Sequence, residues 1–162
     1  MALPMTASSL RPAALLAFLI PAIALTGALT SQYVFGLYPC EMCHWQRWPH
    51  YAALVPALAA ILLPLQPGAK RGLILIAALL IAASGAIGAY HAGVEYGFWP
   101  GFSTCTAGVG TSLEAIWNAP VIRCDVPAFT LFGISMAGYN AIASLGGAAL
   151  VAVLLKRASS QG

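Results

Sequence analysis

Charged residues are absent from four long stretches of this chain, and their absence limits the possible folds more than any other feature. The uncharged windows run from Pro12 to Cys40, Trp48 to Ala69, Gly72 to Val94 and Val126 to Leu155. Each window supplies the ~20 apolar residues that a helix needs to cross ~30 Å of hydrocarbon. An ionised side chain inside hydrocarbon costs at least about 2.5 kcal/mol. We therefore predict an all-α, integral membrane four-helix bundle.

The prediction is one transmembrane domain over residues 1–162, with spans at about 12–31, 48–65, 72–92 and 131–155. Hydrophobic residues make up 60% of the chain and charged residues 7%, which excludes a soluble globular domain and a disordered chain. A cleaved signal peptide is an alternative for the first run. That run is longer than a usual signal-peptide core, and its removal would reverse the sidedness of the remaining loops.

Basic residues predict the orientation, because they concentrate in short cytoplasmic segments beside the spans. Three groups share one side of the predicted bundle: Arg11, Lys70 with Arg71, and Lys156 with Arg157. The other side holds Arg47, Arg123 and all four acidic residues. We therefore expect both termini in the cytoplasm and a long periplasmic loop between helices 3 and 4. The net charge of +3 comes mostly from these anchors and requires no nucleic-acid partner.

The four cysteines form two pairs in the gaps between the apolar runs, Cys40 with Cys43 and Cys105 with Cys124. An even number of membrane crossings separates the gaps, so both pairs should face the same compartment. With cytoplasmic termini, that compartment is one where disulfides persist, and the bacterial periplasm is the natural candidate. The expected location is thus the bacterial inner membrane, with several spans and the cysteine loops in the periplasm.

Cys40-Glu-Met-Cys43 has the spacing of a redox-active pair, in which one thiol often has a lowered pKa. Pro39 favours a helix start here, and the helix dipole would favour a thiolate. Arg47 follows Cys43 by one helical turn, where it can stabilise a thiolate and donate to a carbonyl oxygen of a ligand. The alternatives are a structural disulfide for the pair and an interfacial anchor for Arg47.

The same segment continues into His44 and reads C-x-x-C-H, the attachment signal for c-type haem. A haem needs a surrounding fold and a second axial ligand, and the motif here joins two membrane spans. Zinc is also disfavoured, because Cys105 and Cys124 are not closely spaced and an oxidising compartment opposes thiolate ligation. We expect no metal site.

Cys105 and Cys124 are too far apart for a compact redox motif, and a loop-closing disulfide is the simplest role for them alone. With two pairs on one face, the loop pair can instead exchange with external thiols and pass electrons to the membrane-surface pair. A final acceptor is then needed. The chain has no Gly-rich dinucleotide motif and no convincing haem or iron–sulfur ligand set, so a lipid-soluble quinone is the most economical choice.

Three further features bear on the fold. Thr111-Ser-Leu-Glu114 fits a capping box, which predicts a short surface helix in the long loop. Gly85, Ala89 and Gly93 have small-x-x-x-small spacing that permits close helix packing. We expect Asn140 to bridge helices, a structural role rather than a catalytic one.

Several segments together resemble a known family. They are Pro39-Cys40-Glu-Met-Cys43-His-Trp-Gln46-Arg47, then His91, then Phe102-Ser-Thr-Cys105, and finally Cys124-Asp125 leading to Phe132-Gly-Ile-Ser. Because these segments occur in this order on four spans, the chain resembles the disulfide bond formation protein B (DsbB) family over nearly its whole length. In bacteria, a DsbA, DsbB and quinone chain keeps the periplasm oxidising.

The resemblance implies catalytic roles for all four cysteines. Cys105 would form the mixed disulfide with reduced DsbA-like protein, and Cys124 would be its resting partner. Cys40 would exchange with the loop pair, and Cys43 would act on the quinone, ubiquinone or menaquinone, as a thiolate. Arg47 and His91 match positions of the family's quinone site, although His91 can equally be a helix-end histidine.

Two further readings stay open at this point. A non-enzymatic four-helix membrane protein with structural disulfides would contain the same pairs in an inert form. An enzyme that runs electrons in the opposite direction, as vitamin K epoxide reductases do, would also use a C-x-x-C at a quinone pocket. Direction depends on the potentials of partner and acceptor, which the residues do not determine.

Overall fold

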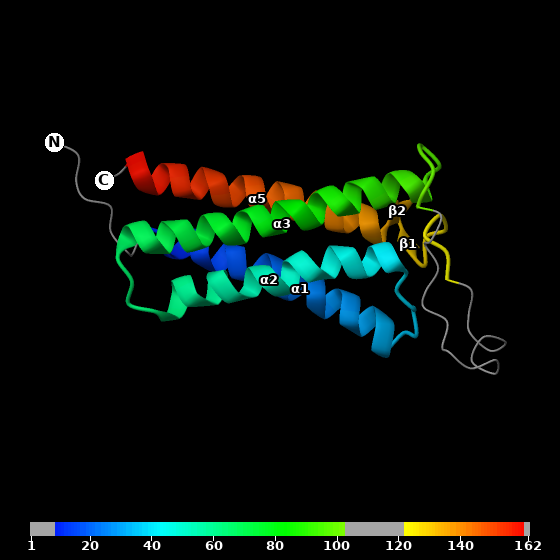
Figure 1. Cartoon of the computed structure of the whole chain (residues 1–162), viewed down its shortest axis with the longest axis horizontal. Coiled ribbons are helices and arrows are strands. Elements are labelled where there is room, and N and C mark those ends of the chain that lie inside the picture. Colours follow the sequence, from blue (N-terminus) through cyan, green and yellow to red (C-terminus); the bar gives the residue numbers. More distant parts are fainter. Residues whose placement is uncertain (1–8, 103–121, 161–162) are drawn as a thin grey trace.

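The computed structural model describes residues 9–102 and 122–160. Within these ranges there are four helices and one two-stranded hairpin (Figure 1). The elements are α1 (Arg11–Tyr33), α2 (Glu41–Leu62), α3 (Pro67–Glu95), β1 (Thr130–Leu131), β2 (Ile134–Ser135) and α5 (Met136–Ser160). The prediction of an all-α four-helix bundle is confirmed for the described part of the chain. The expected surface helix at Thr111–Glu114 lies outside the described residues.

Prolines and a cysteine mark the starts of three of the four described helices. α1 and α3 each carry a proline in their first two positions, where the missing N–H costs nothing. Cys40 is the N-cap of α2, and its side chain accepts a hydrogen bond from the backbone of that helix. α2 ends at Leu62, just before Pro64, because a proline disfavours helical conformation in the residue before it.

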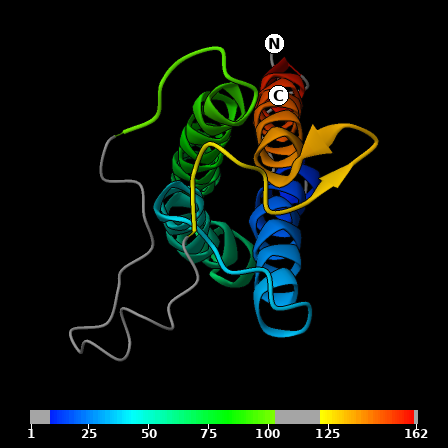
Figure 2. The same cartoon turned by 90° about the vertical axis from the view of Figure 1, so that its right-hand side faces the viewer.

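The four helices surround a common centre when viewed along the bundle (Figure 2). α3 packs extensively against α2 and α5, and α1 packs against the same two helices. α2 and α5 therefore face each other across the centre. Side chains that link these two helices must cross the interior of the bundle.

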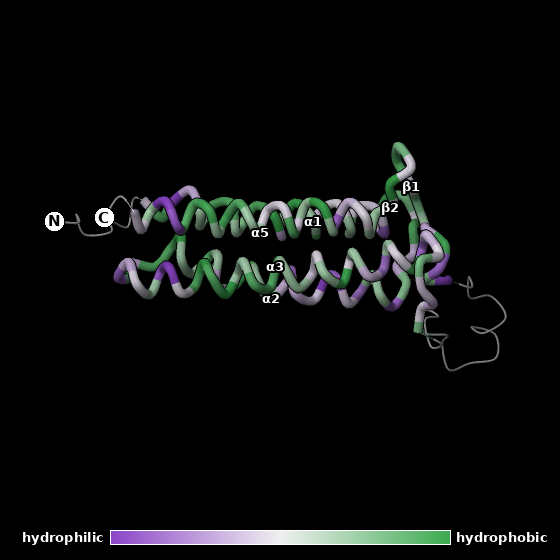
Figure 3. Tube along the Cα trace, turned by 90° about the horizontal axis from the view of Figure 1, so that it is seen from above, coloured by the Kyte–Doolittle hydropathy of each residue, from purple (hydrophilic) through white to green (hydrophobic). Residues whose placement is uncertain are grey.

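Small residues occupy the inside of the bundle and large ones the outside. Its main core contains ten buried alanines, with few larger side chains such as Ile74, Ile81 and Leu155. Large apolar side chains point outward instead: Val55 is 71% exposed and Leu79 70%. Apolar residues dominate most of the length of the helices (Figure 3). This arrangement suits lipid on the outside, where close helix packing rather than hydrophobic burial holds helices together.

Three of the helices, α1, α3 and α5, are long and apolar enough to cross a membrane. Among the described helices α2 alone falls short of this standard, because polar residues fill its first turns. These include Glu41, His44, Gln46 and Arg47. The protein is therefore a membrane protein in which the least apolar helix carries the cysteine motif.

Glycines set the closest approach between α3 and α5. A Cβ on Gly85 would lie 3.0 Å from the backbone nitrogen of Leu145, and one on Gly88 would lie 3.0 Å from the carbonyl oxygen of Ala137. Of the three residues in the predicted small-x-x-x-small spacing, Ala89 is exposed, and the contact with α5 uses Gly85 and Gly88 instead. Gly93 has a different role, since the Trp99 ring packs where its side chain would be.

The cysteine motif lies at the end of the bundle where α1 and α3 end and α2 and α5 begin (Figure 1). A hairpin precedes α5 there, and its turn places Phe132 and Gly133 at positive φ of 50° and 78°. Helix α5 consequently begins at Met136, a few residues after the start of the expected span at 131–155. The Tyr96 hydroxyl donates to the Gly133 carbonyl and accepts from the Ser135 N–H, which ties the hairpin to the end of α3.

Replacing Gly85 with valine should weaken the α3–α5 contact, because the new side chain meets backbone that cannot move aside. Overpacking of this kind costs about 1–3 kcal/mol. We expect a lower midpoint of thermal unfolding in detergent, measured by circular dichroism. Gly146→Ala on α5 is the matched control, since a Cβ there meets nothing within 4 Å. Equal midpoints for the two variants would contradict the close approach.

Candidate functional site

Cys40 and Cys43 lie at the start of α2 with their sulfur atoms 2.9 Å apart. Both are free thiols, and the Cys40 S–H donates to the Cys43 sulfur. The Cys40 sulfur also accepts from the Cys43 backbone N–H at 3.2 Å. The hydrogen bond to Cys43, together with burial, raises the pKa of Cys40 well above its ordinary value. The proton therefore stays on Cys40, and the accepted S–H favours a thiolate at Cys43.

Arg47 is held one helical turn beyond Cys43 by two contacts with α1. Its guanidinium donates to the Gln32 side-chain oxygen and, at 3.2 Å, to the Ala28 carbonyl oxygen. The residue is only 8% exposed, so it is not an anchor that reaches out to the membrane surface. A buried guanidinium fixed in this way presents a positive charge near the Cys43 sulfur.

His91 connects α3 to both cysteine-bearing segments. Its Nε2 lies 3.5 Å from the Cys40 sulfur and 3.2 Å from the Cys124 carbonyl oxygen. The same nitrogen is 3.7 Å from a carboxylate oxygen of Glu95, one turn later on α3. With 1% of its surface exposed, His91 is a buried junction and not a helix-end histidine in solvent.

Cys124 brings the second cysteine segment into this site. It is 3% exposed and disulfide-bonded. The Cys40 sulfur, the Cys124 sulfur and a ring nitrogen of His91 all lie within 4.8 Å of one another. A disulfide sulfur is not the thiolate that zinc binds, so this trio is better suited to sulfur exchange than to a metal. Cys105 lies outside the described residues.

An exposed ion pair flanks Cys124. The Arg123 Nε donates to an Asp125 carboxylate oxygen at 2.8 Å, and a second guanidinium nitrogen donates to the other oxygen. This double contact with Arg123 lowers the pKa of Asp125. The pair is solvent-exposed, so its contribution to stability is small.

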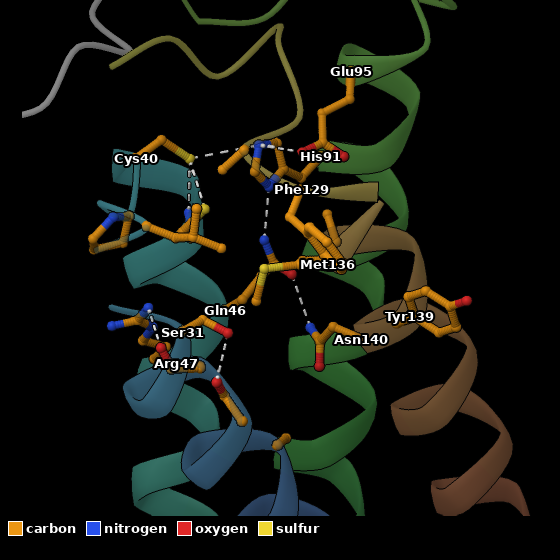
Figure 4. Close-up of a pocket in the computed structure, with 18 of the residues that line it drawn as sticks. Ser31, Cys40, Gln46, Arg47, His91, Glu95, Phe129, Met136, Tyr139 and Asn140 are labelled. Atoms are coloured by element: carbon orange, nitrogen blue, oxygen red, sulfur yellow. Dashed lines mark hydrogen bonds and ion pairs between the residues drawn. The ribbon is translucent and has the colours of Figure 1, made fainter. Parts of the chain in front are cut away.

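A cavity of about 430 Å³ adjoins the cysteines. Its walls come from all four helices and the segment after residue 121, and they are mostly apolar, with Phe129 and Met136 among them (Figure 4). Polar groups stand among the apolar ones on this wall, and they include Cys40, Cys43 and Arg47. Mostly apolar cavities with a few placed polar groups are typical of small-molecule sites.

Sequence reasoning missed several residues of this site. Gln46 and Glu95 bond to or approach His91, and both line the cavity. No sequence motif singles out His50, yet it is 2% exposed and its Nε2 bonds to the side-chain oxygen of Asn140. The signal was available: Gln46 and His50 are polar residues one turn apart on a helix predicted to enter the membrane, where polar side chains are costly. Asn140 does bridge helices as expected, contacting α2 and α3.

Comparison with known proteins identifies the family of this chain. Residues 10–154 match the sequence profile of the family described as disulfide bond formation protein DsbB. The chain is also 30% identical over 134 residues to the uncharacterized protein RP370 of Rickettsia prowazekii (strain Madrid E), a match that covers 78% of this chain and 76% of that protein. No solved structure matches significantly.

Alkylation should distinguish the two thiols at the start of α2. Cys43 is half-buried and accepts a hydrogen bond from Cys40, whereas Cys40 is buried and its pKa is raised. At pH 7 we expect iodoacetamide to modify Cys43 before Cys40. Mass spectrometry of the digested protein measures how much of each cysteine is modified over time. Since a raised pKa keeps Cys40 protonated through neutral pH, its modification should accelerate only as the pH rises. Faster modification of Cys40 at pH 7 would contradict this assignment.

Proposed function

This chain belongs to the DsbB family of membrane disulfide oxidoreductases, and from that premise we propose that it reoxidises a periplasmic DsbA-like protein at the expense of a membrane quinone. The observation that carries the proposal is the approach of the Cys40 and Cys124 sulfurs to within 4.8 Å beside an apolar cavity. Two cysteine segments far apart in the chain meet there, and each supplies a buried sulfur. A pair of merely bracing disulfides would have no need of this contact.

The electrons enter through the loop pair. Reduced DsbA-like protein attacks Cys105, and a mixed disulfide forms as Cys124 leaves as a thiolate. The second thiol of the DsbA-like protein then resolves the mixed disulfide, so the partner becomes oxidised and Cys105 and Cys124 become a dithiol. Two electrons and two protons have moved to the loop pair.

The loop pair then reduces the inner pair. The Cys124 thiolate attacks the Cys40 sulfur of a Cys40–Cys43 disulfide, and the electron pair of the broken bond leaves on Cys43. Cys105 next attacks Cys124, which restores the loop disulfide and releases Cys40. The product of this step has free thiols at Cys40 and Cys43 and a disulfide at Cys124, the same redox state as the described cysteines.

The cavity is the proposed quinone site, with ubiquinone or menaquinone as ligand. A quinone bound there would accept the two electrons and two protons released as Cys40 and Cys43 close into a disulfide. Arg47 supports this assignment because its guanidinium is buried, positive and fixed by α1, and it lines the cavity with Cys43. His91 lines the same cavity from α3.

The proposed location is the bacterial inner membrane, with four spans including α2 and with the cysteine end in the periplasm. Support comes from the distribution of charge along the bundle. Arg11, Lys70 and Arg71 lie at the starts of α1 and α3, and Arg157 lies in the last turn of α5. These helix ends are together at the end opposite the cysteines (Figure 1). Basic residues of this kind favour the cytoplasmic side.

A quinone reduction assay tests the activity directly. Purified protein in detergent would be mixed with reduced DsbA-like protein and a short-chain ubiquinone, and quinone absorbance followed. We expect reduction that requires the DsbA-like protein and is lost in both Cys43→Ser and Cys105→Ser. Folded protein with intact disulfides and no quinone reduction would favour the non-enzymatic interpretation.

Arg47→Gln should raise the KM for quinone by about tenfold or more, because loss of a charged hydrogen-bond donor costs about 1.5–3 kcal/mol. The same assay, run over a range of quinone concentrations, measures it. Arg157→Gln is the matched control, since that arginine lies at the other end of the bundle. An unchanged KM in Arg47→Gln would remove this residue from the quinone site.

A further inference from the structure

A line of buried and partly buried hydrogen bonds leads through the bundle to Cys40. It passes from His50 on α2 to Asn140 on α5, back to Gln46 on α2, and then to His91 on α3. The distances are 3.0 Å, 2.9 Å and 2.8 Å, and the last step reaches the Cys40 sulfur at 3.5 Å. Figure 4 shows the part from Asn140 to Cys40.

Two backbone carbonyl groups determine which way the side-chain amides point. The nitrogen of Asn140 faces the Ser84 carbonyl oxygen at 3.2 Å, and a carbonyl oxygen can only accept. The nitrogen of Gln46 likewise faces the Met42 carbonyl oxygen at 3.2 Å. A flip of either amide would place two oxygen atoms against each other. Both orientations are therefore fixed by the helices themselves.

The amide orientations then determine the tautomer of His91. Gln46 donates to Nδ1 of His91, so Nδ1 is the acceptor and the ring proton of neutral His91 lies on Nε2. That N–H faces the Cys40 sulfur and the Cys124 carbonyl oxygen, both of which accept. The opposite tautomer would turn a lone pair toward both acceptors and an N–H toward the Gln46 N–H.

Every donor in this line points the same way, toward Cys40. Hydrogen bonds aligned head to tail polarise one another, and the low dielectric of the interior strengthens the effect. Amides do not release protons near neutral pH, so the line carries no proton. It acts as a row of fixed dipoles whose positive end, the His91 N–H, meets the sulfur.

We propose that Gln46 and Asn140 are positioning residues, which hold His91 as an Nε2–H donor and so stabilise negative charge where the Cys40 and Cys124 sulfurs exchange. The inference rests on the proposed function for its biological purpose. It states that the His91 donor lowers the free energy of forming a thiolate at Cys40 when the Cys40 proton is no longer shared with Cys43. In the last step of the exchange Cys105 attacks Cys124, the Cys124–Cys40 bond breaks, and its electron pair leaves on Cys40. The negative charge therefore develops on the Cys40 sulfur, which faces the His91 N–H.

Three titratable groups face Cys40 and act on its charge. Cys43 of α2 accepts a hydrogen bond from the Cys40 S–H, and the negative charge of Glu95 on α3 repels a thiolate at Cys40. His91, also on α3, supplies the donor. The described part of the segment that carries Cys124 brings a disulfide sulfur and a carbonyl oxygen near this point. The His91 N–H at the end of the hydrogen-bond line therefore opposes the repulsion between Glu95 and a thiolate at Cys40.

The test measures the reactivity of Cys40 in the full-length protein. In a Cys43→Ala background with the loop disulfide oxidised, the rate of iodoacetamide alkylation of Cys40 is recorded against pH. Adding Gln46→Met, which keeps the length of the side chain and removes the donor, should slow alkylation at pH 7 by about threefold to tenfold, since a one-unit pKa rise lowers the thiolate fraction about tenfold. The pH profile should move to higher pH. Asn140→Leu should act in the same direction.

Ser144→Ala is the matched control. Ser144 is buried in the same bundle and donates to Asn140, but His50 still supplies a donor to that oxygen when Ser144 is lost. Its profile should superimpose on that of the parent, because the Asn140 amide keeps its orientation. Superimposable profiles for Gln46→Met and the parent would overturn the proposal.

A second measurement does not depend on any variant folding. Nitrogen-15 NMR of the unaltered protein, labelled at histidine, reports which ring nitrogen of His91 carries the proton. A proton on Nε2 supports the proposal, and a proton on Nδ1 overturns it. Neither experiment uses quinone or a DsbA-like protein. If the protein reduces no quinone but gives the expected alkylation profiles, the proposed function fails and this inference stands. If it reduces quinone but the profiles of Gln46→Met and the parent superimpose, this inference fails and the proposed function stands.

Discussion

The hydrogen bonds of His91 hold the functional end of this protein together. One imidazole on α3 contacts the Cys40 sulfur, the Cys124 carbonyl oxygen and the Gln46 side chain. In the interior of a membrane protein a polar group without a partner costs several kcal/mol, so each of these contacts restricts where the others can lie. The positions of the two cysteine segments and the cavity beside them all follow from this junction.

The rest of the bundle makes that junction possible by packing closely. Alanines fill the core, and Gly85 and Gly88 bring α3 against α5. Close packing places Asn140 within reach of both α2 and α3, although α2 and α5 lie across the centre from each other. A bundle with large core residues would hold these polar groups too far apart to satisfy one another.

The site combines two environments that redox chemistry at a membrane surface requires. Toward the cavity, mostly apolar walls that also carry Arg47 and Cys43 suit a small apolar ligand with a polar group. Toward the loop, Cys40 and Cys124 place two sulfurs where a thiolate and a disulfide can meet. Proton sharing between Cys40 and Cys43 assigns different characters to the two thiols, one protonated and one poised as a thiolate.

Local patterns were sufficient to predict much of this protein. Charge-free runs predicted the helices, because hydrocarbon excludes charge over a length that the chain itself reveals. Cysteine spacing and the Arg47 position predicted the redox pair and its cationic neighbour, since both depend on contacts within one or two helical turns. The family resemblance rested on the same local strings, and the family match over residues 10–154 confirms it.

Tertiary structure alone decided which distant groups meet. The approach of Cys124 to Cys40, the burial of Arg47 against α1, and the line from His50 to His91 join residues on different helices, and no periodicity along the chain specifies such pairings. The choice of Gly88 over Ala89 as the contact with α5 depended likewise on the rotation of one helix against another. The sequence determines which residues each helix can bury. Packing in three dimensions determines which residues of the other helices they contact.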